Sequence, residues 1–212
     1  MASIYVTAFG PFAGVEVNPT EELLTDLQAR WKSQPLGRLL MGPSGHQVDV
    51  EATKIKLETY ACNEASFRVP DCDGWQPQEE PISQSHPFKS KLITEVPVRV
   101  IAGMLETRGF PVEQSFDAGR FVCNYTYYQS MRLAAQASRP VQALFVHVPR
   151  AEAMPLQRQK EVLWEILREL AETMTGALEV GGSADLLNKI QVERWPSVLR
   201  AMQAGCCPSE VA

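Results

Sequence analysis

Residues 117–149 read DAGRFVCNYTYYQSMRLAAQASRPVQALFVHVP, and this stretch decides how the chain folds. Cys123 stands where a loop gives way to a helical pattern, and His147 stands near the end of the apolar run 141–148. A strand expected at residues 111–116 leads into the loop. We expect the second strand to be parallel to the first, because such crossovers are right-handed and return the chain to the same edge. Cys123 and His147 are therefore predicted to lie at one edge of a sheet.

A cysteine and a histidine that meet in this way can act as nucleophile and base. The thiolate is the reactive form of cysteine, and the start of a helix and a nearby imidazole both favour it. Backbone N–H groups at a helix start can bind the oxyanion of acyl transfer, and a third group would orient the imidazole. A blander interpretation stays open, since a cysteine before a helix is usually a small buried hydrophobe. A lone histidine in a strand is usually a core residue whose ring nitrogens are hydrogen-bonded.

The rest of the chain alternates between strand and helix patterns, which indicates an α/β fold. The first strand is expected at Ser3–Ala8, and the first helix opens at Asn18-Pro19. Later helices are expected at residues 97–108, 123–137 and 155–174, with a short strand in 36–45 and extended structure or a hairpin in 46–57. Residues 64–90 are punctuated by Pro and Gly and predict a long irregular excursion.

Composition limits the function classes. The chain has 212 residues and a formal net charge of −5 without a Lys/Arg cluster, so we expect no nucleic-acid partner. No apolar window is long enough for a membrane span, and the first residues lack the pattern of a signal peptide. The five cysteines form no C-x-x-C pair, which favours a reduced, cytoplasmic protein. No ligand set for zinc is visible, and we expect neither a metal nor a cofactor.

Three stretches resemble pyroglutamyl-peptidase I, the family of cysteine peptidases that remove N-terminal pyroglutamate. They are VTAFGPFAGVEVNP at residues 6–19, DAGRFVCNYTYY at 117–128 and ALFVHVP at 143–149, in the order that the family has. The resemblance covers most of residues 3–174. It implies a three-layer α/β/α sandwich with an open, mostly parallel sheet, formed by residues 1–175, and leaves residues 176–212 as a tail of unknown structure.

The resemblance also implies roles for individual residues. Cys123 would be the nucleophile, His147 the base and Glu58 the third catalytic residue, since Asn63 follows Glu58 at the family's spacing. The implied reaction is hydrolysis of the bond after an N-terminal pyroglutamyl residue through a thioester, with pyroglutamyl peptides as substrates. The implied substrate-binding residues are Phe9, Phe12, Asn18, Arg68, Val69, Phe121 and Val122. Apolar walls suit an uncharged lactam ring and disfavour a charged amino terminus.

One interval departs from the family pattern. The family has a strand, a helix and a second strand between the first helix and the Gly-rich turn at residues 41–45. Residues 32–41 are too few for all three, so we expect the sheet to lack a strand-helix-strand segment there. The alternative function is accordingly a catalytically impaired relative that acts as a small-ligand binding or interaction protein. The sequence leaves the oligomeric state open.

Overall fold

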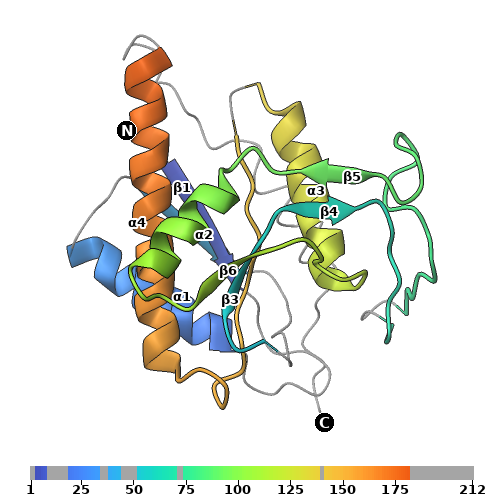
Figure 1. The fold of residues 1–212 in the computed structure, drawn as a ribbon. Helices are drawn as coiled ribbons and strands as arrows, with labels where there is room; N and C mark the ends of the chain where they lie inside the picture. The colour runs from blue at the N-terminus through green and yellow to red at the C-terminus, as the bar shows by residue number, and fades with distance from the viewer. Residues whose placement is uncertain are drawn as a thin grey trace. The chain divides into compact units, whose positions relative to one another are not determined.

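The structure is a computed structural model, and it divides the chain into two compact units, residues 1–45 with 155–212 and residues 46–154. The structure describes residues 3–8, 19–33, 38–43, 52–70, 74–138 and 141–181 (Figure 1). The proposed pocket residues Phe9, Phe12 and Asn18 lie outside these ranges, as does the tail beyond Gly181.

The first unit is a βαβ arrangement with an added helix. It contains β1 (Ser3–Ala8), α1 (Pro19–Ser33), β2 (Arg38–Pro43) and α4 (Leu156–Gly181). β1 pairs with β2 in parallel, so α1 is the crossover between them. The strand predicted between the first helix and the Gly-rich turn is thus present. Among the described residues between α1 and residue 52, β2 is the one element.

Two tryptophans hold the helices of this unit together. The rings of Trp31 on α1 and Trp164 on α4 pack edge to face with centroids 5.9 Å apart, and both side chains are buried. The Arg30 guanidinium lies 4.5 Å from the Trp164 ring centroid, which adds a cation–π contact. The same core contains Leu27 and Leu167, with Ile4 and Val6 of β1 packed against it.

The second unit contains the remaining elements in chain order. These are β3 (Ile55–Glu58), β4 (Tyr60–Cys62), β5 (Lys91–Ile93), α2 (Val98–Thr107), β6 (Val112–Ser115), α3 (Val122–Gln136) and β7 (Val146–His147). β3 is the central strand of a three-stranded sheet in the order β6-β3-β7. A strand with neighbours on both sides is expected to be apolar, and Ile55 and Leu57 are fully buried.

α2 begins and ends where the sequence predicts. Pro97 is its N-cap, and Ile101 and Leu105 are fully buried on one helix face. Gly109 follows the helix with φ +81°, a backbone conformation that favours glycine and allows the chain to turn into β6. Both units therefore combine helices with strands, and the α/β class is confirmed.

The predicted direction of the last strand is wrong. β3 pairs with β6 in parallel, but it pairs with β7 antiparallel, with Lys56 opposite His147. The chain after α3 enters the sheet from the carboxyl end of β3, because the Phe145 carbonyl already accepts the Glu58 N–H there at 3.0 Å. The crossover rule concerns parallel returns and does not apply to this connection. His147 nevertheless lies on the strand next to β3, and its side chain contacts that of Glu58 at the end of β3.

The Pro- and Gly-rich excursion is better ordered than the sequence indicates. β4 and β5 close it as an antiparallel pair beside α3, which Figure 1 shows on the α3 side of β3. The buried amide of Asn63 holds the intervening loop, since it accepts the Ser83 N–H at 2.8 Å and donates to the Ser83 carbonyl at 2.9 Å. It also donates to the carbonyls of His86 and Pro87. The order of this segment comes from two short strands and one buried amide, which leave no periodic pattern in the sequence.

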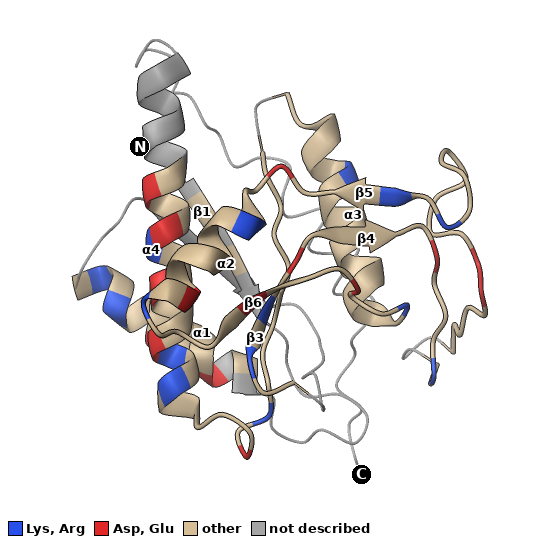
Figure 2. Ribbon diagram, in the orientation of Figure 1, with Lys and Arg blue, Asp and Glu red and all other residues tan. Residues whose placement is uncertain are grey.

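Basic and acidic residues are interspersed along α4 (Figure 2). Arg158 pairs with Glu161 at 3.0 Å, and Lys160 pairs with Glu22 of α1 at 3.0 Å. Within the described ranges, no helix has the length and apolar character that crossing a membrane requires.

Candidate active site

Glu58 ends β3 with its side chain fully buried. Its Oε1 lies 2.8 Å from Nδ1 of His147, and its backbone carbonyl accepts the Tyr127 hydroxyl at 2.8 Å. Its second carboxylate oxygen, Oε2, is buried without a hydrogen-bond partner among the described residues. A buried carboxylate needs compensation, and the imidazole of His147 is the cationic partner that it contacts.

His147 is held between two partners. Nδ1 faces Glu58, which leaves Nε2 for the Cys123 side chain, the second group that forms a hydrogen bond with this imidazole. The ring packs edge to face against Phe145 with centroids 4.9 Å apart. Burial lowers the pKa of His147, but the hydrogen bonds and charges of Cys123 and Glu58 outweigh it and raise that pKa to about 10. The imidazole is therefore protonated at neutral pH.

Cys123 is the second residue of α3, and its side chain is buried and free of any disulfide. The helix dipole favours negative charge at this position. Phe121, the N-cap residue, makes no side-chain hydrogen bond to the first turn, so its side chain does not occupy the N–H groups there. Those N–H groups form the kind of donor set that can bind an anion next to a thiolate.

Two further residues of α3 fix its beginning against the sheet. Asn124 is buried, and its amide accepts the Cys62 N–H at 2.8 Å and donates to the carbonyls of Cys62 and Glu64, each at 2.9 Å. Tyr127 is buried one helical turn after Cys123 and donates to the Glu58 carbonyl. Burial raises the pKa of Tyr127, so the hydroxyl stays protonated and remains a donor. α3 is thus anchored to β4 and to the end of β3.

The segment after β4 lies against the start of α3. The Arg68 guanidinium is 5.1 Å from the Phe121 ring centroid, and the Phe67 ring packs edge to face against Phe121 with centroids 5.2 Å apart. Trp75 and Tyr125 continue this aromatic cluster through contacts with Phe67. The backbone of Phe67 is held in turn, since its carbonyl accepts the Gln76 and Gln78 side-chain amides.

The structure brings together part of the site expected from the sequence. Glu58, His147 and Cys123 are in contact, and Arg68 lies against Phe121. Val69 is 41% exposed and Val122 is half-buried at the first position of α3, so both are accessible from outside the core. The remaining pocket candidates fall outside the described residues.

The sequence reading overlooked the anchoring residues Asn124 and Tyr127. A signal for one of them was present, because Tyr127 follows Cys123 at i+4 and so shares its helix face. Asn124 gave a weaker signal, namely a polar residue in the first turn of a helix that was expected to be buried. Both belong to the motif around Cys123, in which only the cysteine was assigned a role.

A thiol at a helix start, an imidazole and a buried carboxylate in hydrogen-bond contact form the arrangement that cysteine hydrolases use for acyl transfer. Comparison with known proteins makes the class specific. Residues 49–165 match the model of the Peptidase_C15 family, described as pyroglutamyl peptidase. The chain belongs to this family.

Relatives by sequence agree with that assignment. The chain is 31% identical over 168 residues to a pyrrolidone-carboxylate peptidase of Pyrococcus furiosus, covering 69% of this chain and 80% of the relative. It is 32% identical over 173 residues to one of Gloeobacter violaceus, again covering 69% and 80%.

Solved structures show the same fold. The pyrrolidone carboxyl peptidase of Thermococcus litoralis matches with a TM-score of 0.68 at 21% identity, covering 84% of this chain and 97% of that one. The pyroglutamyl peptidase I of Bacillus amyloliquefaciens matches with a TM-score of 0.70 at 22% identity, covering 80% and 97%.

Metal binding receives no support from the part of the chain that the structure describes. No group of three or more His, Cys, Asp or Glu side chains is placed there to hold a metal ion.

Proposed function

We propose that this protein is a cysteine omega-peptidase that releases pyroglutamate from the amino terminus of peptides. The observation that carries the proposal is the contact of Cys123 with His147 and of His147 with Glu58, in a chain that belongs to the pyroglutamyl peptidase family. This contact also favours activity over the alternative of an impaired binding protein, which would have no need to keep the three groups together.

In the proposed reaction His147 holds the proton that Cys123 gives up, and Sγ attacks the carbonyl carbon that joins pyroglutamate to the next residue. The electron pair of the carbonyl moves to its oxygen. Backbone N–H groups at the start of α3 bind that oxyanion, and Arg68 lies against the same helix start as a second source of positive charge. Glu58 keeps the imidazole oriented and favours its charged form.

Collapse of this intermediate breaks the C–N bond. The imidazolium of His147 gives its proton to the leaving amine, and the pyroglutamyl group remains on Cys123 as a thioester. Water then attacks the thioester with His147 as base, which releases pyroglutamate and restores the thiol. Every proton that moves passes through Nε2, because Nδ1 faces Glu58.

Substrate selection follows from the apolar character of the expected pocket. Val69, Phe121 and Val122, together with Phe9 and Phe12, would surround the lactam ring. An uncharged ring loses little hydration there, whereas a free α-ammonium group would lose much more. Asn18 and Arg68 complete the proposed set as polar contacts. Cys62 and Cys123 form no disulfide, which suits a reducing compartment, and we assign the protein to the cytoplasm on that basis.

The experiment is hydrolysis of pyroglutamyl-aminomethylcoumarin by the purified chain, followed by fluorescence. We expect turnover that the Cys123→Ala variant lacks, and no cleavage of the glutaminyl analogue with its free ammonium group. Cys62→Ala is the matched control, since Cys62 is equally buried but has no proposed role. Absence of turnover by folded protein, or undiminished turnover by Cys123→Ala, would disprove the proposal.

A further inference from the structure

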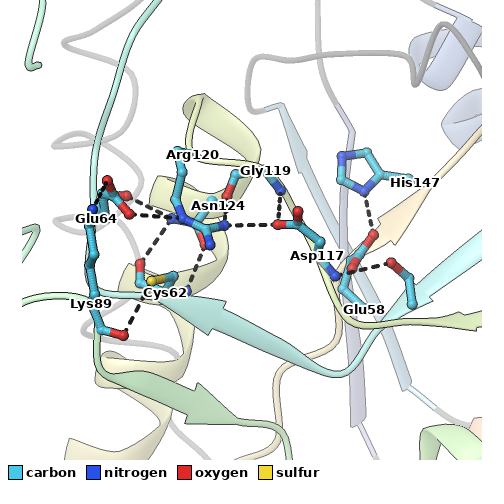
Figure 3. Close-up of polar contacts among 10 residues, drawn as sticks. Glu58, Cys62, Glu64, Lys89, Asp117, Gly119, Arg120, Asn124 and His147 are labelled. Atoms are coloured by element: carbon cyan, nitrogen blue, oxygen red, sulfur yellow. Dashed lines mark hydrogen bonds and ion pairs between the residues drawn. The ribbon is translucent and has the colours of Figure 1, made fainter. Parts of the chain in front are cut away.

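Arg120 lies in the loop between β6 and α3, three residues before Cys123, and the proposed mechanism does not use it. Its side chain is about one-third exposed, at 33%. Ion pairs of that exposure often contribute little to the stability of a protein. The surroundings of Arg120 differ from an ordinary surface pair, because its guanidinium binds Glu64 and Asp117, which belong to two separate parts of the chain (Figure 3).

Within its own loop, Arg120 closes a tight turn. Nη1 donates to Oδ1 of Asp117 at 2.8 Å and to the Gly119 carbonyl. The same Asp117 oxygen accepts the Gly119 N–H at 3.0 Å. Gly119 has φ +73°, a left-handed conformation that favours glycine. The guanidinium therefore fixes the shape of the loop from which α3 and Cys123 begin.

Across the loop, Arg120 binds the segment of residues 64–68. Nε donates to Oε2 of Glu64 at 3.0 Å, and the Arg120 carbonyl accepts the Ser66 N–H at 2.7 Å. The Glu64 side chain is only 9% exposed, and its other oxygen, Oε1, lies 3.4 Å from Nζ of Lys89. A carboxylate that is so nearly buried requires its cations, and removal of one leaves an uncompensated charge.

We propose that Arg120 is a positioning residue for the reaction. Arg120 fixes the conformation of the loop before Cys123 and holds that loop against segment 64–68. The last residue of this segment, Arg68, contacts Phe121 at the start of α3. The inference rests on the proposed function, since it supposes that Cys123 and segment 64–68 act on one substrate. Arginine suits this role better than lysine, because its planar fork addresses Glu64 and Asp117 at once from different nitrogens.

The test compares Arg120→Gln and Arg120→Lys with a matched control, Arg158→Gln, which removes an Arg–Glu pair of α4 at the same 3.0 Å distance. Two rates are measured well below the unfolding temperature. The first is alkylation of Cys123 by iodoacetamide, followed by mass spectrometry of its peptide. The second is kcat/KM for pyroglutamyl-aminomethylcoumarin. Circular dichroism establishes that each variant is folded, so that loss of structure is separated from loss of position.

We expect Arg120→Gln to lower both rates by about tenfold to a hundredfold, the scale for misplacing a reacting group by about 1 Å. Arg120→Lys should recover only part of this loss, and Arg158→Gln should change neither rate. The double variant Arg120→Gln/Glu64→Gln should react faster than Arg120→Gln alone, because it removes the nearly buried carboxylate that has lost its Arg120 partner and keeps only Lys89.

Unchanged alkylation and unchanged kcat/KM in folded Arg120→Gln would overturn the inference. So would a lower unfolding temperature with unchanged rates, which marks a merely structural ion pair. Failure of the proposed function has a different signature. In that case the wild-type chain does not hydrolyse the substrate, while the alkylation of Cys123 still depends on Arg120.

Discussion

The Glu58→Gln substitution tests how the buried carboxylate acts on His147. Glutamine has nearly the same shape, and its amide oxygen can still accept from Nδ1, so the change removes charge and keeps geometry. The pKa of His147 is about 10 against an ordinary 6.5. At ~1.4 kcal/mol for each pH unit, that difference corresponds to roughly 5 kcal/mol in favour of the imidazolium.

Two partners, Cys123 and Glu58, produce this stabilisation against the cost of burial. Removal of the Glu58 charge is expected to cost about 2 kcal/mol of imidazolium stabilisation. This is equivalent to a rate loss of about thirtyfold, because the charged ring protonates the leaving amine. We therefore expect kcat/KM to fall by about that factor, with KM changing little, because Glu58 is not expected to touch the substrate.

The assay combines kinetics with nuclear magnetic resonance. The chain has three histidines, so the ring carbon signal of His147 can be assigned by one substitution and followed with pH. In the wild type this signal should not titrate until the pH approaches 10, and in Glu58→Gln its midpoint should move clearly downward. Glu106→Gln is the matched control, since Glu106 is exposed and its Oε1 lies 3.3 Å from Nζ of Lys54. It should leave both readouts unchanged.

A wild-type His147 signal that titrates near 6.5 would refute this role of Glu58. The role is also refuted if Glu58→Gln keeps kcat/KM within twofold of the wild type. Either result means that the carboxylate does not favour the charged imidazole, whatever its distance from the ring.

Three further predictions concern stability. Asn124→Leu should lower the free energy of unfolding, measured in urea, by about 2–4 kcal/mol, because it leaves the buried backbone groups of Cys62 unpaired. A loss below about 0.5 kcal/mol would contradict this prediction. Gly109→Ala should destabilise the protein by about 1 kcal/mol, because Gly109 has φ +81°. Gly103→Ala inside α2 should stabilise the protein by about 0.5–1 kcal/mol. Thermal melts in which both substitutions shift the unfolding temperature in the same direction would contradict the two backbone conformations. Folding raises the pKa of His147, so its contribution to stability is complete below pH 6.5 and is lost as the pH rises toward about 10. The stability difference between wild type and His147→Gln should shrink over that interval, and a constant or growing difference would oppose the prediction.

Much of the fold could be predicted from local sequence. The bounds of α2 and α3 follow from Pro97, Gly109 and the helical pattern after Cys123, and β1 and β2 follow from apolar runs beside turn residues. These features are local, because propensity and capping act over a few residues. The pairing of β7 was mispredicted, since strand direction depends on where a connection re-enters the sheet, and no short pattern encodes that.

The candidate site divides in the same way. The proximity of Cys123 and His147 was predicted, but from a parallel return of the chain that the structure does not have. Glu58 was identified through the resemblance, by its spacing from Asn63. The order imposed on the loop by Asn63 could not be predicted, because its hydrogen bonds reach across some twenty residues, from Asn63 to positions 83–87. Such contacts are decided by tertiary structure rather than by local preference.

The most direct test of the account is to trap the acyl-enzyme. Wild-type protein is mixed with a pyroglutamyl ester, quenched in acid within milliseconds and digested, and the peptide that contains Cys123 is weighed by mass spectrometry. We expect a mass increase of one pyroglutamyl group on Cys123, which builds up and then decays as pyroglutamate appears. Hydrolysis without any modified Cys123, or the same modification on Cys62 instead, would contradict it.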